Sequence, residues 1–413
     1  MARSVGFTAT ATSPVTISRL VLTLIAGMFV LAMFAAQAAQ AQTFSVIHTF
    51  RGGADGGGPS AGLTKDPAGN LYGVTSYGGS AGQGNVFKLT RKNSGWVLSS
   101  LYSFQGGNDG ADPESRVIIG PDGSLYGTTI HGGDQSCIYG PGCGTIFNLR
   151  PPATFCRAIT CPWTETVLHR FTLDEGGPGG ELVFDVQGNL YGTTSEGVFE
   201  LAPSSGGWAF SLIYQLQALW VSGVILDRAG NLYGAVEQYG ATSSVYELTP
   251  SPSGWTASVL YTLDYRTDGG GPGGLVFDQA GNLYGGTWEG GPDHGGTVFQ
   301  LSPTNGGWTF STLYAFAGSG SGGPCCGRLL MDASGSLYGA TFGDGAYGYG
   351  SAFKLLPSNG GWIYTDLHDF PLIGSDGWSP NNPLALDSNG NLYGTASGGG
   401  ANNGRGTVWE ITP

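Results

Sequence analysis

A three-residue motif, Leu-Tyr-Gly, occurs seven times in this chain of 413 residues, and this recurrence constrains the fold more than any other feature. Successive tyrosines of the motif lie 54, 65, 42, 51, 54 and 55 residues apart. Periods of this size exceed the roughly 20–29 residues of a leucine-rich solenoid turn and are typical of repeats that each build one small sheet. The motif tyrosines are Tyr72, Tyr126, Tyr191, Tyr233, Tyr284, Tyr338 and Tyr393. We therefore expect seven similar units in tandem.

Each copy of the repeat contains four short segments with strand character. In the copy around Tyr284 they are 275–278 (LVFD), 282–287 (NLYGGT), 297–301 (TVFQL) and 308–316 (WTFSTLYAF), which we call strands a, b, c and d. Turns that contain Gly or Asn separate these segments, as antiparallel hairpins require. Four antiparallel strands per copy predict the blade of a β-propeller.

The two ends of the chain predict how the ring closes. Residues 43–50 (TFSVIHTF) match strand d, whereas 407–413 (TVWEITP) match strand c, so the last copy lacks a strand d of its own. A ring in which the first segment pairs with the last uses both and leaves no open sheet edge. The expected fold is therefore all-β: a seven-bladed β-propeller of four-stranded antiparallel blades, closed by the N-terminal strand completing the last blade.

The composition excludes several other classes of protein. Glycine accounts for 76 of 413 residues, about 18%, but without the strict three-residue period of collagen. Glycine is also unfavourable inside helices, by about 1 kcal/mol relative to alanine. Hydrophobic residues make up 40% and aromatic residues 12%, which is ample material for a core and excludes disorder. The formal net charge of -13 argues against a nucleic-acid partner.

The first 41 residues have the features of a secretory signal peptide. Arg3 and Arg19 precede an apolar stretch over 20–36, and an Ala-Gln-Ala site at 39–41 follows it. We expect cleavage before Gln42, with an uncleaved anchor helix as the alternative. The remaining residues 42–413 are expected to form a single propeller domain with no membrane span, secreted or located in the periplasm or at the cell surface.

Export makes the six cysteines candidates for disulfide bonds. They fall into three local pairs, and zinc binding is the alternative at such short spacings. The pairs expected are Cys137 with Cys143, Cys156 with Cys161, and Cys325 with Cys326.

Five loops between strand d and the next strand a carry an aspartate. Four of them, Asp55, Asp109, Asp268 and Asp376, begin a D-G-x-x-P motif, and Asp174 is a relative. Loops on a rigid scaffold are common binding sites, and we expect these residues to bind ligand around the mouth of the central channel. Carboxylate oxygens are suitable ligands for Ca²⁺, so this cation is the one candidate cofactor at these residues. The alternative is that each Asp bonds its own backbone in a turn.

The repeat is irregular between Tyr191 and Tyr233, where the loop after strand b shrinks to 195–197 and the next d-to-a loop, 217–223, has no D-G motif. Short loops beside long ones predict a notch in that face. Trp220 lies in the irregular loop, where it is either a ligand-stacking residue or part of the core.

The repeated sequence resembles that of a bacterial family. Residues 185–194 (DVQGNLYGTT) and their equivalents resemble the tandem repeat of the choice-of-anchor tandem repeat GloVer-containing family, over essentially the whole chain after residue 41. The resemblance implies export and surface display, and it brings no catalytic or binding residues with it. Members often end in an anchoring segment; this sequence ends at Pro413 in strand c, so plain secretion or a periplasmic location is expected.

No catalytic constellation stands out from the repeat. Two G-x-S-x-G matches, at 58–62 and 78–82, are about as frequent as the glycine content predicts, and neither lies between a strand and a helix. His48, His169 and His368 occupy a slot of strand d that is Tyr in other copies. We therefore expect a monomeric, non-catalytic binding module for an extracellular carbohydrate or protein. The alternative is an extracellular propeller hydrolase or lyase acting on a glycan or lactone.

Overall fold

The computed structural model describes residues 42–413 except 138–139, 153–162, 217, 239–241, 319–321, 325–326 and 402, together with Met1 and Gly6. The side chains of residues 219–220 and 381–382 also lie outside this description, as does almost all of the predicted signal peptide. Residues 43–412 form one compact unit. Its regular structure is β-strand, apart from one short 3-10 turn, η1 (Gly107–Asp109). Among the residues described, no helix is long and apolar enough to cross a membrane.

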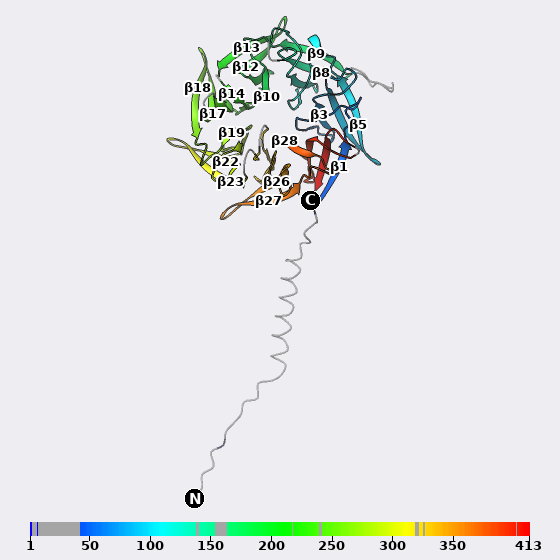
Figure 1. Ribbon diagram of the computed structural model, residues 1–413. Coiled ribbons are helices and arrows are strands. Elements are labelled where there is room, and N and C mark those ends of the chain that lie inside the picture. The colour runs from blue at the N-terminus through cyan, green and yellow to red at the C-terminus, as the bar shows by residue number, and fades with distance from the viewer. Residues whose placement is uncertain are drawn as a thin grey trace. The chain divides into compact units, whose positions relative to one another are not determined.

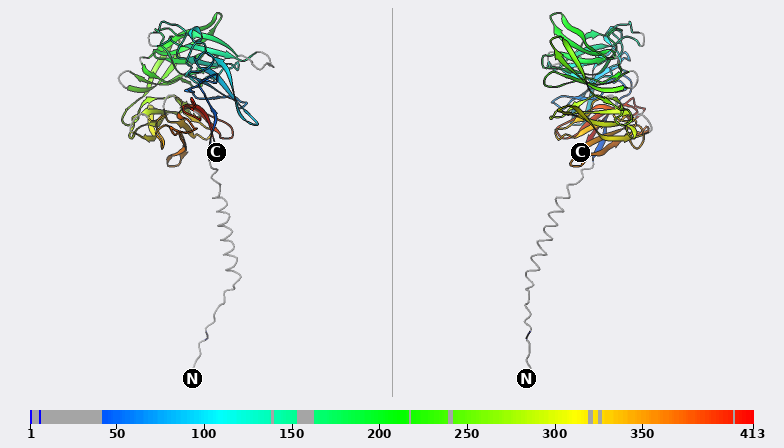
Figure 2. Two further views of the ribbon diagram at one scale, coloured as in Figure 1. Left: turned by 45° about the vertical axis from the view of Figure 1, so that its right-hand side comes forward. Right: turned by 90° about the vertical axis from the view of Figure 1, so that its left-hand side faces the viewer.

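Seven antiparallel sheets follow one another around a ring (Figure 1), which confirms the seven-bladed β-propeller. The turned views in Figure 2 show the same arrangement of strands from two other directions. The strands, from innermost to outermost, are as follows: in blade 1 β2 (Thr64–Lys65), β3 (Leu71–Thr75), β4 (Asn85–Lys92) and β5 (Gly95–Ser103); in blade 2 β6 (Ile118–Ile119), β7 (Leu125–Thr129), β8 (Thr145–Arg150) and β9 (Thr164–Arg170); in blade 3 β10 (Pro178–Phe184), β11 (Leu190–Thr194), β12 (Gly197–Ser204) and β13 (Gly207–Gln215); in blade 4 β14 (Ala218–Val221), β15 (Ile225–Leu226), β16 (Leu232–Gln238), β17 (Thr242–Ser251) and β18 (Gly254–Leu263); in blade 5 β19 (Gly270–Pro272), β20 (Val276–Phe277), β21 (Leu283–Glu289), β22 (His294–Thr304) and β23 (Gly307–Ala317); in blade 6 β24 (Leu330–Met331), β25 (Leu337–Ala340), β26 (Ser351–Ser358) and β27 (Gly361–Asp369); in blade 7 β28 (Trp378–Leu386), β29 (Leu392–Gly398), β30 (Thr407–Thr412) and β1 (Thr43–Thr49).

In four of the seven blades the innermost strand extends beyond the four-residue strand a expected from the sequence, whereas in blades 1, 2 and 6 it is only two residues long. In blades 4 and 5 it consists of two pieces that pair with the same neighbour, β14 and β15 with β16, and β19 and β20 with β21. In blades 3 and 7 it is one strand with a register shift in its middle. Part of the predicted d-to-a loop is therefore strand, because the chain resumes pairing before the bulge that precedes strand a.

The glycine of each Leu-Tyr-Gly motif is required by an aromatic ring of strand c. A Cβ atom on Gly73 would lie 2.6 Å from the ring of Phe87, and one on Gly127 would lie 2.7 Å from Phe147. Phe87 is fully buried. The missing side chain on strand b thus provides the space that the strand c ring fills, and any larger residue would displace that ring.

The aspartate of each D-x-x-G-N turn binds both ends of its hairpin. Asp66 accepts hydrogen bonds from the backbone N–H of Asn70 (2.8 Å), from its Nδ2 (2.7 Å) and from the hydroxyl of Tyr72 (3.1 Å). The equivalent aspartates Asp185, Asp227, Asp278, Asp332 and Asp387 bind their motif tyrosines in the same way. This network explains why Asp and Tyr recur six residues apart.

The same tyrosines connect neighbouring blades. The Tyr72 ring lies edge-on to Trp163, which precedes strand d of the next blade, with centroids 6.5 Å apart. Tyr191 and Trp255 form the same contact at 5.9 Å, as do Tyr284 and Trp362 at 6.0 Å. The predicted packing of these aromatic residues between blades is confirmed for these pairs.

The N-terminal strand completes blade 7, as the ends of the sequence predict. β1 pairs antiparallel with β30, so that Phe44 lies opposite Ile411, and Figure 1 shows the blue strand beside the red ones. The Phe44 ring also stacks on His368 of blade 6, with centroids 3.6 Å apart. β1 therefore completes the sheet of blade 7 and also packs this blade against blade 6.

Removing this strand should destabilise the whole ring. We expect deletion of residues 42–49 to lower the melting temperature by more than the substitution Phe44→Ala, whose cost is about 2–4 kcal/mol for a large apolar side chain. Circular dichroism melts of both variants and of the chain starting at Gln42 test this expectation. A deletion variant that melts like the parent would contradict closure by β1.

Stability should fall in acid because of the hairpin aspartates. Burial opposes ionisation of Asp66, but the hydrogen bonds from Asn70 and Tyr72 outweigh it and hold its pKa below the ordinary value. The same balance lowers the pKa of Asp278, Asp332 and Asp387. A lowered pKa stabilises the fold above the ordinary carboxyl pKa, and this contribution is lost as pH falls through the folded value.

We therefore expect the free energy of unfolding to decrease as the pH falls below about 4, the ordinary carboxyl pKa. Denaturant unfolding at pH 6 and pH 3 measures this decrease. Asp66→Asn should reduce the pH-dependent difference, whereas Asp174→Asn, at an exposed position, should leave it unchanged. An equal effect of the two substitutions would contradict the role of the turns.

Candidate functional site

The predicted D-G aspartates bind strand d of the preceding blade. Asp268 accepts hydrogen bonds from the Tyr261 hydroxyl (2.9 Å) and from its own loop, at the Asp264 N–H (3.0 Å). Asp109 makes the equivalent bonds to Tyr102 and to the N–H of Gln105. These carboxylates therefore hold the start of each blade-to-blade loop against the outermost strand.

Histidine replaces tyrosine at three of these junctions. Nε2 of His368 lies 3.1 Å from Oδ2 of Asp376, and Nε2 of His48 lies 3.7 Å from Oδ2 of Asp55. Burial lowers the pKa of both histidines, although the facing carboxylates oppose this shift. The third junction uses Glu175 in place of Asp174.

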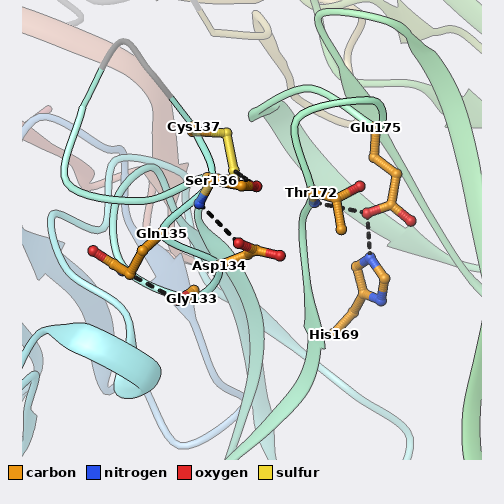
Figure 3. The surroundings of a disulfide bond; sticks show 9 residues. Gly133, Asp134, Gln135, Ser136, Cys137, His169, Thr172 and Glu175 are labelled. Carbon is orange, nitrogen blue, oxygen red and sulfur yellow. Dashed lines mark hydrogen bonds and ion pairs between the residues drawn. A yellow bond between two sulfur atoms is a disulfide. The ribbon is translucent and has the colours of Figure 1, made fainter.

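Figure 3 shows this third junction. The Glu175 carboxylate accepts hydrogen bonds from the N–H of Thr172 (2.9 Å) and lies 3.0 Å from Nε2 of His169. Asp174 is exposed, so the residue matched by sequence pattern is one position away from the residue that makes the contact.

The D-G carboxylates thus face side chains and backbone of their own junctions rather than one another. Within the described part of the chain, no three His, Cys, Asp or Glu side chains are grouped so that they could hold a metal ion. Four of the five aspartates already form a hydrogen bond or an ion pair within the protein. Ligand binding by these aspartates stays a prediction.

The remaining predicted residues are only partly described. Cys137 and Cys143 form a disulfide bond, as expected (Figure 3). Cys156, Cys161, Cys325 and Cys326 lie outside the described residues. The backbone of Trp220 belongs to β14, where it lies opposite Glu237, and its side chain is likewise outside the description.

One outer junction contains an acid where four others have an aromatic ring. At those four junctions the Tyr or His of strand d stacks on an aromatic residue of the next blade, as in Tyr261 with Phe310 and His169 with Phe210. Phe210 and Phe310 each lie two residues after the tryptophan of strand d. In blade 2 the residue at this position is Glu165. Burial, and then the neighbouring carboxylate of Asp109, raise the pKa of Glu165 to about 7. Sequence reasoning missed this residue, although it departs from the repeat.

Glu165 should make stability decrease as pH rises towards 7. Its folded pKa is above the ordinary value, so the folded state retains a proton that the unfolded chain has lost between about pH 4.5 and pH 7. Glu165→Gln should therefore stabilise the protein at pH 8, by on the order of 1 kcal/mol, and have little effect at pH 4.5. Thermal melts at the two pH values, with the exposed Glu196→Gln as the control, test this. Equal stabilisation at both values would argue against titration of Glu165.

Three charged side chains meet in the central channel. Arg116, Glu181 and Arg328 come from the innermost strands, or the residues just before them, in blades 2, 3 and 6. Nη2 of Arg116 lies 2.7 Å from Oε2 of Glu181, and Nη2 of Arg328 lies 3.7 Å from the same oxygen. Burial opposes ionisation of Glu181, but Arg116 and Arg328 outweigh it and lower its pKa. We call these three residues the channel cluster.

The channel cluster occupies a single slot of the repeat. The residue immediately before the buried first residue of strand a is Gly in blades 1, 4 and 5, and Pro in blade 7. Arg116, Glu181 and Arg328 stand at this slot in the other three blades. The sequence therefore indicated this cluster, because three copies have a charge at a position where the other copies have Gly or Pro. Only the closed ring shows that these three positions lie close together.

Two cavities adjoin the channel cluster. The larger, of about 450 Å³, is lined by Ser60, Glu114 and the shortened loop at Thr194 and Ser195, on the face of the d-to-a loops. The smaller, of about 230 Å³, is lined by residues nearer the a-to-b turns, such as Ile118 and Phe184. Arg116 and Glu181 line both cavities, so the channel cluster lies between them.

A third cavity lies over blades 5 to 7, on the face of the d-to-a loops. It has a volume of about 550 Å³ and is lined by Phe342, Tyr349 and Trp378, together with Asp344. Phe342 is 44% exposed and Tyr349 is 37% exposed. We call this cavity the aromatic cleft. Phe342 and Tyr349 come from the loop before β26, Phe316 from β23 and Trp378 from the start of β28, and none of them was singled out as a ligand residue from the sequence.

The fold and the repeat define the class of the protein, a β-propeller built from tandem repeats. The chain belongs to the Gloeobacter/Verrucomicrobia repeat family, whose model matches residues 32–218 and 221–413. This match confirms the resemblance seen in the sequence. No curated protein sequence matches the chain.

Solved structures share the fold at low sequence identity. The extracellular domain of a putative hybrid two-component system from B. thetaiotaomicron is 12% identical, with a TM-score of 0.54, and the match covers 90% of this chain and 42% of that one. Puromycin hydrolase is 15% identical, with a TM-score of 0.53, and the match covers 83% of this chain and 51% of that one. The chain therefore spans about half the length of these proteins or less, and the likeness shows the propeller fold alone.

Proposed function

We propose that this protein is exported and acts at the cell exterior as a non-catalytic module that binds carbohydrate in the aromatic cleft. The signal-like segment of residues 1–41 and the repeat family support export. The observation that carries the binding proposal is the aromatic cleft itself, where Phe342, Tyr349 and Trp378 line one cavity together with the buried Phe316.

The chemistry of the aromatic cleft matches that of a sugar. A pyranose ring has apolar C–H faces and polar hydroxyls at its rim, so it packs on an exposed aromatic ring while its hydroxyls reach polar groups. Phe342 and Tyr349 are the exposed rings, and Asp344 provides an acceptor for hydroxyl groups. Burial raises the pKa of Asp344, although a backbone hydrogen bond opposes the shift.

The arrangement favours binding over hydrolysis. Glycoside hydrolysis generally uses two carboxyl groups that flank the scissile bond. Among the described residues that line the aromatic cleft, Asp344 is the one acidic side chain. The hydrolase or lyase alternative therefore has no specific support from this cavity.

A glycan array followed by calorimetry on the ligand found tests the proposal. Protein recovered from the periplasm or medium should begin at Gln42 and bind at least one glycan. Phe342→Ala and Tyr349→Ala should each weaken binding about tenfold, because stacking on one ring contributes about 0.5–1.5 kcal/mol. Tyr265→Ala is the matched control, since Tyr265 is 45% exposed and does not line the aromatic cleft. Absence of any glycan ligand, or equal losses in all three variants, would contradict the proposal.

A further inference from the structure

The smaller channel cavity combines apolar walls with an excess of positive charge. Ile118, Val183 and Ile225 line it, and its charged residues are those of the channel cluster, two arginines and one glutamate. The cavity therefore carries a net charge of about +1 in a protein whose formal net charge is -13. This local reversal of sign is a feature that the repeat does not explain, because four of the seven blades have no charge at this slot.

Arg116 is already paired on both sides. Besides Glu181, its Nη1 lies 3.3 Å from the hydroxyl oxygen of Thr64 in blade 1. Its side chain is 14% exposed. This guanidinium therefore joins three blades and is not the group that a ligand would reach first.

Among the described residues, Arg328 is the arginine of the channel cluster with fewer of its donors engaged. Its closest charged partner among the described residues is Oε2 of Glu181, at 3.7 Å, which is beyond a normal hydrogen bond. Its side chain is 35% exposed and lines the smaller cavity but not the larger one. A guanidinium offers five N–H donors in a planar fork, a geometry that matches a carboxylate.

The channel cluster is also incompletely satisfied. Oε1 of Glu181 and Nε of Arg116 are buried and have no hydrogen-bond partner within the described part of the chain. Unpaired buried polar atoms are costly and uncommon in folded proteins, and of these two the Nε–H of Arg116 is a donor that an acceptor in the adjoining cavity can satisfy. Both atoms belong to residues that line the smaller cavity.

We propose that the smaller channel cavity binds a small organic monocarboxylate with an apolar body. The carboxylate accepts hydrogen bonds from the fork of Arg328, and the apolar body packs against Ile118, Val183 and Ile225. A single net positive charge suits a monoanion, whereas a more highly charged ion such as phosphate would be repelled by Glu181 and would leave the apolar walls unfilled. The site is separate from the aromatic cleft and does not depend on carbohydrate binding there.

Ligand-observed NMR and calorimetry with benzoate as the probe test this site. Benzoate should bind the protein, and neutral benzamide of the same shape should bind at least about tenfold more weakly, since it lacks the charge. Inorganic phosphate should also bind more weakly. Benzamide or phosphate binding as tightly as benzoate would overturn the assignment, as would the absence of benzoate binding.

Two substitutions in the channel cluster should act in opposite directions. Arg328→Met removes the charge and keeps much of the side-chain length, and it should weaken benzoate binding at least about tenfold. Glu181→Gln removes the competing carboxylate and should strengthen binding several-fold. Arg266→Met, at an exposed position elsewhere, is the matched control and should leave binding unchanged.

Thermal melts show whether each variant is folded before its binding is interpreted. If Arg328→Met does not fold, Arg328→Lys keeps the charge but loses the fork and should still bind several-fold more weakly than the parent. Parallel losses in Arg328→Met and Glu181→Gln would show that the channel cluster only holds blades together and would overturn the proposal. Glycan binding by Arg328→Met should remain normal, so failure of this site is distinguishable from failure of the aromatic cleft.

Discussion

The rest of the structure depends on the contact between one glycine and one aromatic ring in every blade. The strand b glycine leaves room for the strand c ring, and the distances that a Cβ would have to the ring are similar in Gly192 with Phe199 (2.5 Å) and Gly285 with Phe299 (2.6 Å). In blade 7 the ring is the larger Trp409, which is fully buried. Because protein interiors are close-packed, repetition of this contact forces the seven blades to the same internal geometry. The high glycine content follows in part from this requirement and from the hairpin turns.

A uniform scaffold makes differences between blades informative. Where all copies agree, the residue serves the blade, as with the hairpin aspartates and the motif tyrosines. Where single copies differ, the residue is free to serve a site. Arg116, Glu181 and Arg328 illustrate this, because each replaces a small or rigid residue at a slot that faces the channel. Glu165 is a second example, since it replaces an aromatic ring at an outer junction.

The sequence predicted the fold, whereas the ligand-binding role of its candidate site residues stays a prediction. The blade number, the strand count and the closure by β1 all follow from a periodic pattern and its ends, because each copy forms its sheet largely from its own residues. The D-G aspartates were predicted to bind ligand at the channel mouth, but Asp109 and Asp268 bind the neighbouring tyrosines of strand d. An acidic residue that recurs in several loops suggests a ligand site when only the sequence is known. In these two loops its partner is instead a tyrosine seven residues earlier in the same junction.

The sequence by itself determined the blade, its number and the order of strands around the ring. Those properties depend on local spacing, on alternation of apolar residues and on the complementary ends of the chain. Only the tertiary structure decided which residues form a site. The channel cluster joins residues 116, 181 and 328, and the aromatic cleft joins the loop at 342–349 with residues 316 and 378 of two strands. Such neighbours are set by the curvature of the closed ring, which brings distant copies together, and no spacing within one copy contains that information.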